Sequence, residues 1–164
     1  MQYDARQIAN CLLDTGDRRG IELTHLAIQK LVYFSHGLAY ARFGEGLVLN
    51  RFEAWKNGPV IRELYFAFNQ FEENPITDRA TLLNFDSGLD EVIRYDFSPQ
   101  LLSHLDEICR IYGPLPAGKL IAMTHERGTP WEHTISRATR SANVGMLIDE
   151  DLIRRFFTHA EART

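Results

Sequence analysis

Residues 24–43 read THLAIQKLVYFSHGLAYARF, and this stretch decides the predicted fold. Thr24 has the side chain of a helix N-cap, and Gly44 and Gly46 stop a helix soon after Phe43. Between these limits the apolar residues do not keep to one stripe but cover more than one face of the helix. We therefore expect a central helix that packs against neighbours on several sides.

The segments on either side of this helix carry further helix signals. Asp4 is placed to cap a first helix with one apolar stripe, and Gly16 and Gly20 mark its predicted end. Cap residues and prolines then predict four helix starts nearer the C-terminus, at Ser98-Pro99, at Pro116, at the capping box Thr129-Pro130-Trp131-Glu132, and at Asp149.

An extended element interrupts the helices between residues 47 and 58, where apolar and polar residues alternate weakly. Asn57-Gly58 signals a tight turn at its end. Pro59 then suits the first position of a helix, whose apolar spacing continues to Phe71. This part of the chain is expected to contain one or two short strands followed by a helix.

A second short strand is expected over residues 92–97, after a turn at residues 86–88. No internal repeat or low-complexity segment divides the chain. We therefore predict a mainly α fold over residues 1–164, a single compact helical domain with a small central β-hairpin or extended ribbon.

The overall composition is that of an ordinary globular protein, with 45% hydrophobic and 24% charged residues among 164. The net charge of −4 disfavours binding to the nucleic-acid backbone. No apolar run reaches membrane-spanning length, and no signal-peptide pattern opens the sequence. The expected location is the cytoplasm, with no membrane partner, and a nucleic-acid partner is disfavoured but not excluded.

The sequence offers only weak candidates for catalysis or metal binding. No pair among its six histidines has the HExxH spacing, although His125-Glu126 and Glu132-His133 bring four ligand-capable groups near each other. A helix-end position for His125 and a capping role for Glu132 explain this segment without a metal. The sequence also contains no nucleophile elbow, phosphate-binding loop or dinucleotide fingerprint. We therefore predict no enzyme activity, no cofactor and no metal site.

Several residues have more than one interpretation. Lys30, in the central helix, either extends its amine to solvent, which we favour, or pairs with a carboxylate, or has a function. Trp55 and Trp131 either close the core over loops, which we favour, or anchor a partner. Cys11 and Cys109 are expected to be buried as small hydrophobic residues. A basic concentration near the C-terminus is expected to be a solvated face, with an acidic partner second and nucleic acid third: Arg137, Arg140, Arg154 and Arg155.

Three blocks stand in a fixed order in this sequence: QKLVYFSHG at 29–37, EAWKNGPV at 53–60, and TH at 124–125 followed by TPW at 129–131. They resemble the QKLLYFAQG-like helix, the EAWxxGPV signature and the TH…PW segment of the Panacea domain, a family found in antitoxins and phage-associated GepA-like proteins. His36 and Ile121 depart from the pattern, because Gln and Ser are usual there. The resemblance implies a set of scaffold or interface residues: Gln29, Lys30, Tyr33, His36, Glu53, Trp55, Gly58, Pro59, Tyr65, Thr124, His125, Pro130 and Trp131.

The resemblance implies an antitoxin that neutralises a cognate toxin, usually encoded by an adjacent gene, through direct protein contact. The SocA-type branch further implies a proteolytic adaptor that delivers the toxin to the ClpXP protease. The N-terminal region has no added helix-turn-helix domain, so DNA-binding autoregulation has no support. A regulatory binding protein of a phage or mobile element, without a toxin, is the alternative, and a metal-dependent hydrolase using His125 and His133 ranks third.

Overall fold

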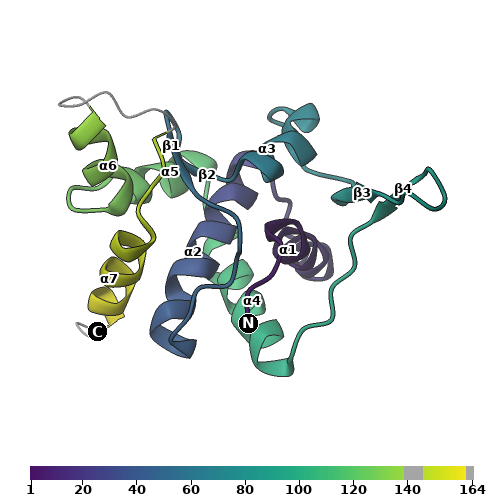
Figure 1. Cartoon of the computed structure of the whole chain (residues 1–164), viewed down its shortest axis with the longest axis horizontal. Helices are drawn as coiled ribbons and strands as arrows, with labels where there is room; N and C mark the ends of the chain where they lie inside the picture. Colours follow the sequence, from purple (N-terminus) through teal and green to yellow (C-terminus); the bar gives the residue numbers. More distant parts are fainter. Residues whose placement is uncertain (139–145, 162–164) are drawn as a thin grey trace.

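The computed structural model, which describes residues 1–138 and 146–161, is built around helix α2 (His25–Phe43), as Figure 1 shows. The Thr24 hydroxyl accepts a hydrogen bond from the Ala27 amide at the start of α2, and Gly44 ends it in a left-handed conformation. Five other helices (α1, α3, α4, α5 and α7) and strand β2 pack against α2. The predicted central helix is therefore confirmed, with neighbours on several sides.

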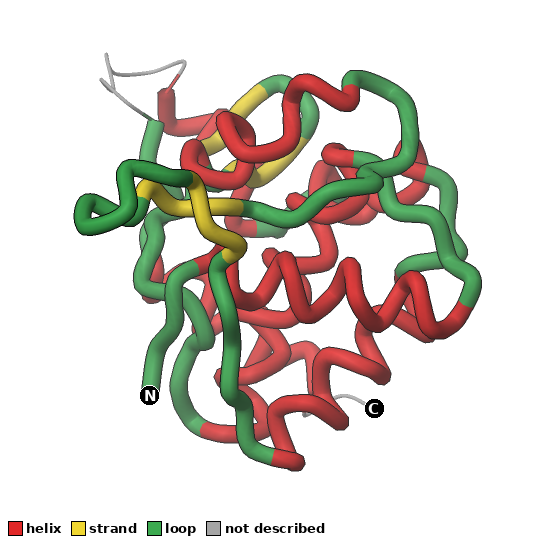
Figure 2. The backbone as a smooth tube through the Cα atoms, turned by 90° about the vertical axis from the view of Figure 1, so that its right-hand side faces the viewer, coloured by secondary structure: helices red, strands yellow, loops and turns green. Residues whose placement is uncertain are grey.

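The remaining helices make the fold mainly α, as predicted (Figure 2). Asp4, Ser98, Thr129 and Asp149 each accept a hydrogen bond from a backbone amide at a helix start, so the predicted caps are confirmed. The helices are α1 (Ala5–Arg19), α3 (Arg62–Phe68), the short 3₁₀ helix η1 (Asn69–Phe71), α4 (Pro99–Tyr112), α5 (Ala117–His125), α6 (Pro130–Ala138) and α7 (Glu150–Glu161).

Two details of these helix ends correct the sequence predictions. Of the two glycines predicted to mark the end of α1, Gly16 lies within the helix, and Gly20 ends it after Arg19 in a left-handed conformation. The predicted capping box at α6 is incomplete, since Glu132 accepts from the Gly128 amide rather than the Thr129 amide. The hydroxyl of Thr129 still caps the helix through the Glu132 amide.

The predicted ribbon is an antiparallel hairpin formed by β1 (Glu53–Trp55) and β2 (Gly58–Val60). The prediction that Pro59 begins a helix is wrong: Pro59 lies in β2 opposite Ala54, and α3 begins at Arg62. Side chains of α2 hold this segment in an extended form, which overrides the local helix signal. Phe71, the last apolar residue of the predicted helix, falls in η1.

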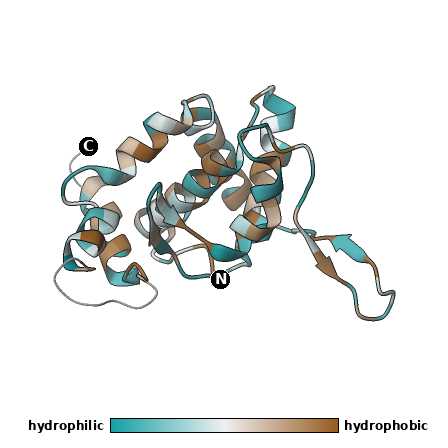
Figure 3. Cartoon of the chain, turned by 90° about the horizontal axis from the view of Figure 1, so that it is seen from above, coloured by the Kyte–Doolittle hydropathy of each residue, from teal (hydrophilic) through white to brown (hydrophobic). Residues whose placement is uncertain are grey.

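A second antiparallel hairpin pairs β3 (Thr81–Leu83) with β4 (Asp90–Val92) and projects away from the helices in Figures 1 and 3. The sequence prediction missed β3 and placed the other strand at 92–97, a segment that is almost entirely irregular. Short strands of three residues carry too little periodicity to be recognised.

Apart from Val60, the buried hydrophobic side chains of the described residues form one cluster. Aromatic rings contribute to this cluster near the middle of α2, where Tyr33 contacts Phe52 and Phe157 edge to face. Cys11 and Cys109 are buried and free, as predicted. Among the described residues, no helix has both the length and the apolar character needed to cross a bilayer.

Gly37 allows α7 to pack closely on α2. A Cβ atom at this position would lie 2.2 Å from ring carbons of the buried Phe157. We expect Gly37→Ala to lower the free energy of unfolding by about 1–3 kcal/mol, because overpacking outweighs the better helix propensity of alanine. Urea denaturation followed by circular dichroism measures the change.

Gly118 in α5 is the matched control, since a Cβ there would have no atom of the described residues within 4 Å. Gly118→Ala should raise the free energy of unfolding by about 0.5–1 kcal/mol through helix propensity alone. Equal stabilisation by Gly37→Ala and Gly118→Ala would contradict the close packing of α7 on α2.

Candidate functional site

Consecutive residues of α2 fix the backbone of strand β2 and of Ile61, the residue after it. The Lys30 Nζ donates a hydrogen bond to the Pro59 carbonyl oxygen at 3.0 Å. The Gln29 amide exchanges two hydrogen bonds with the Ile61 backbone, at 3.0 Å to its carbonyl oxygen and 2.9 Å from its amide. Both side chains are buried, so the QK and GPV blocks of the sequence form one structural unit.

Lys30 does not extend its amine to solvent, and that prediction is wrong, because the residue is 0% exposed. Within the described residues its hydrogen-bond partner is a neutral carbonyl and not a carboxylate. Burial lowers the pKa of the Lys30 amine to about 7. The amine is therefore partly neutral at physiological pH.

Gly58 is required where β2, α2 and α5 meet. Its φ of +100° lies in the region that favours glycine. A Cβ there would lie 2.5 Å from the Thr124 hydroxyl oxygen and 2.8 Å from Lys30 Cε. This glycine therefore allows the second and third sequence blocks to touch the first.

The outer side of this unit is a half-buried aromatic surface. The Trp131 indole N–H donates to the Trp55 carbonyl oxygen at 2.7 Å, and the His125 ring stacks on Trp131 with centroids 3.7 Å apart. Trp55 in turn contacts Tyr65 with centroids 5.0 Å apart. We call these residues, with His25 beside Tyr65, the motif cluster.

Two histidines of the motif cluster have a buried ring nitrogen without a hydrogen-bond partner among the described residues: His25 Nδ1 and His125 Nε2. Burial, and after it the positive charge of Lys30, lowers the pKa of both imidazoles. His25 and His125 are therefore neutral rings near a buried amine. No carboxylate of the described residues joins them in a group of three or more metal-ligating side chains.

The remaining candidate residues divide between this cluster and the core. Glu53 accepts from the Trp55 indole N–H at 2.7 Å and pairs with Arg62, which ties β1 to α3. Pro130 occupies the first turn of α6. Tyr33 is buried among aromatic rings further along α2, away from Pro59.

His36 has a separate structural role. Its Nδ1 accepts hydrogen bonds from the Leu47 and Val48 amides, each at 3.1 Å, so its Nε2 carries the proton that it donates to Glu150. Although burial opposes it, the hydrogen bond from His36 lowers the pKa of Glu150 below its ordinary value. His36 thus joins α2, the 47–48 segment and the start of α7.

Sequence reasoning did not nominate His25, which joins the cluster from the first residue of α2. It follows the cap Thr24, and one turn separates it from Gln29. A spacing of one turn between two polar residues is too common in helices to have identified His25 as part of the site.

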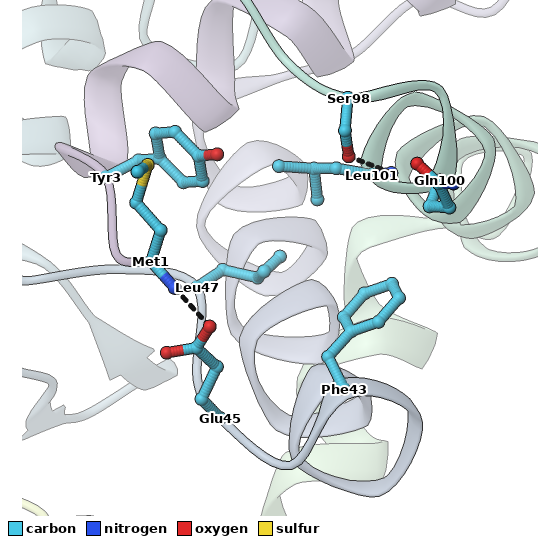
Figure 4. A pocket seen from close by; sticks show the side chains of 8 residues that line it. All are labelled: Met1, Tyr3, Phe43, Glu45, Leu47, Ser98, Gln100 and Leu101. Atoms are coloured by element: carbon cyan, nitrogen blue, oxygen red, sulfur yellow. Dashed lines mark hydrogen bonds and ion pairs between the residues drawn. The ribbon is translucent and has the colours of Figure 1, made fainter.

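The pocket in Figure 4 lies away from the motif cluster. It has a volume of about 240 Å³, and Tyr3, Phe43 and Leu101 are among its lining residues. None of its lining residues belongs to the candidate set. A second hollow of about 730 Å³ beside α7 is lined partly by Arg127, Arg155 and His159.

Of the predicted basic concentration, Arg154 and Arg155 both contact Asp151, while Arg140 lies outside the described residues. Asp151 offsets part of the positive charge at this end of α7. The interpretation of these arginines as a solvated face remains a prediction.

The low pKa of Lys30 predicts a dependence of stability on pH. The folded chain releases this proton near pH 7, whereas the unfolded chain keeps it up to about 10.5. Stability contributed at this site therefore rises with pH between these values, by up to roughly 1.4 kcal/mol per pH unit. The free energy of unfolding of the wild type, minus that of Lys30→Met, should increase from pH 7 to 10. A constant difference would contradict the isolated burial of the amine.

Trp131 tests whether the cluster holds the hairpin in place. Trp131→Phe keeps a ring for stacking but removes the hydrogen bond to the Trp55 carbonyl, so we expect a loss of about 1 kcal/mol. Because Trp131 is only half-buried, Trp131→Ala should cost less than the 3–5 kcal/mol typical of a fully buried tryptophan. Urea titration measures both, and unchanged stability in both variants would contradict a structural role.

Two comparisons with known proteins identify relatives of this chain. The family described as "Antitoxin SocA-like, Panacea domain" matches residues 28–132, which include the motif blocks. The chain is 32% identical over 154 residues to Antitoxin SocA of Caulobacter vibrioides (strain NA1000 / CB15N), covering 94% of this chain and 82% of that protein. No solved structure matches the chain significantly. The chain therefore belongs to the family of SocA-like antitoxins with a Panacea domain.

Proposed function

We propose that this chain neutralises a cognate toxin, encoded by a neighbouring gene, by binding it directly. The observation that carries the proposal is the similarity to Antitoxin SocA along 94% of the chain. Family membership supports the antitoxin role, and direct contact is our inference about how it is carried out. A toxin made inside the cell has to be bound inside the cell, so the proposal places this protein in the cytoplasm.

The internal contacts of the motif cluster support a binding role rather than catalysis. Lys30, the buried amine near that cluster whose pKa is lowered, is fully covered and bound to a backbone carbonyl. A reacting group needs access to substrate, whereas a scaffold residue does not. Partner choice in this proposal therefore belongs to exposed positions around a shared scaffold.

Direct binding allows two outcomes for the toxin. The antitoxin either covers the active surface of the toxin, or delivers the toxin to the ClpXP protease as an adaptor. The second mode follows from the resemblance to the SocA-type branch. The two modes differ in what they do to the lifetime of the toxin.

The test is co-expression with each adjacent gene in a host that lacks both. We expect the neighbour alone to stop growth, this chain alone to be harmless, and co-expression to restore growth and give a complex that co-purifies. A pulse-chase measurement of toxin lifetime, with and without ClpX, separates the modes: only delivery makes the toxin short-lived in a ClpX-dependent way.

Harmless neighbours and the absence of a co-purifying product would contradict the proposal. That result would favour the alternative, a regulatory protein of a phage or mobile element without a toxin. Gly37→Ala serves as a folding control, because it lies in the core and should reduce rescue only through the amount of folded protein.

A further inference from the structure

The β3–β4 hairpin exposes an unusual amount of apolar surface. Its large apolar side chains range from 47% exposed at Leu83 to 90% at Phe85, and Figure 3 shows the hairpin standing clear of the helices. Single exposed apolar residues are normal, but a group of them marks an interaction site. The group consists of Leu82, Leu83, Phe85, Leu89 and Val92.

The base of this hairpin is held firmly by α1. Asn10 is 1% exposed, and its side-chain amide donates to the carbonyl oxygens of Ala80 and Ile93, at 3.1 and 2.9 Å. Its Oδ1 accepts from the Ala80 amide at 2.8 Å. Arg79 adds an ion pair with Asp14 at 2.7 Å. The hairpin therefore leaves the body of the protein in a fixed direction.

The tip is also ordered by its own hydrogen bonds. Asn84 Oδ1 accepts from the amides of Asp86 and Ser87, at 2.9 and 3.3 Å, and its Nδ2 donates to Glu91 at 2.8 Å. Gly88 supplies the left-handed residue of the turn, with φ +69°. Phe85 is thus presented on a preformed loop, which reduces the entropy lost on binding.

The charge of this surface indicates the chemistry of its partner. Between residues 81 and 92 the charged side chains are Asp86, Asp90 and Glu91, and all are acidic. A groove of about 540 Å³ separates the hairpin from α3, and the exposed Phe66 is among its lining residues. Its carboxylates are those of Glu63, Asp78 and Asp90. Arg6 and Arg79 also line it, but their guanidinium groups already pair with Asp4 and with Asp14 and Asp17. Apolar side chains with carboxylates around them are complementary to a partner surface that is basic and carries apolar side chains.

We propose that the β3–β4 hairpin and the groove beside α3 bind the toxin, through a basic patch of the toxin that carries apolar side chains. This inference rests on the proposed function. A second copy of the chain is a poorer occupant, because two acidic hairpins repel each other. An anionic membrane is disfavoured for the same reason.

The apolar part of the proposal is tested with Phe85→Ser and Leu89→Ser. Ile111→Ser is the matched control, since Ile111 is 42% exposed on α4, outside the hairpin and the groove. Titration against the purified product of the adjacent toxic gene should show affinity about 30-fold or more weaker for Phe85→Ser, the loss of a hot-spot residue. The control should bind like the wild type.

The charge part is tested with Asp86→Lys and Asp90→Lys, each compared with Glu22→Lys on the exposed segment before α2. We expect each hairpin variant to bind about 10-fold more weakly at low salt, with a smaller difference at high salt. The Glu22→Lys variant makes the same change in net charge and should keep its affinity.

The substituted hairpin side chains are exposed, so the melting temperature of each variant should match that of the wild type. Toxin binding that is equal in the wild type and the hairpin variants would overturn this inference and leave the proposed function standing. A wild type that binds no product of its neighbours would overturn both. A homodimer that the hairpin substitutions dissociate would show that a second copy occupies the surface, and would overturn the basic partner.

Discussion

The hydrogen bond from Lys30 of α2 to strand β2 is the constraint on which the motif cluster depends. Removing a lysine ammonium from water costs several kcal/mol, and one hydrogen bond to a neutral carbonyl offsets only part of that cost. The Lys30 amine meets this cost partly by losing its proton, as its lowered pKa indicates. The hydrogen bond fixes β2 on α2. Residue 58 has to be a glycine for β2 to approach α2 this closely.

Hydrogen bonds from a buried amide side chain hold both hairpins in place. Gln29 exchanges two hydrogen bonds with the Ile61 backbone, and Asn10 makes the equivalent pair with Ala80. Each is a buried amide side chain on a helix that binds both backbone groups of one residue at the edge of a hairpin. Because a hairpin of three-residue strands is marginal by itself, these amides supply the support that a larger sheet would give. One hairpin lies under the motif cluster, and the other is carried out into solvent.

The sequence predicted the parts of the fold that are encoded locally. Helix starts at Asp4, Thr24 and Ser98 follow from a cap that bonds within one turn, so a short window of sequence is enough. Pro59 was misplaced because its strand conformation comes from Lys30, 29 residues earlier, and no local pattern reports that contact. The position of Lys30 was misjudged for the same reason.

The candidate site was predictable only through the family resemblance. The residues that the resemblance implies include every member of the motif cluster except His25. Their identities do not reveal that Trp131 donates a hydrogen bond to the Trp55 carbonyl oxygen, or that Tyr33 lies in the core instead. The β3–β4 hairpin lay outside the resemblance blocks, and its strands were too short to recognise. A surface that selects among different partners is the part of a fold least constrained by packing.

His36 shows how the chain departs from the family pattern without changing the chemistry. The imidazole accepts two backbone amides at Nδ1 and donates from Nε2 to Glu150. A glutamine, usual at this position in the resemblance, has a carbonyl oxygen with two lone pairs and an N–H₂ group, so it offers the same acceptors and donor. The histidine ring differs from a glutamine side chain in shape. Gly46 leaves room for the ring, because a Cβ at this position would lie 2.3 Å from the imidazole. The bulkier ring at position 36 therefore depends on glycine at position 46, ten residues along the chain.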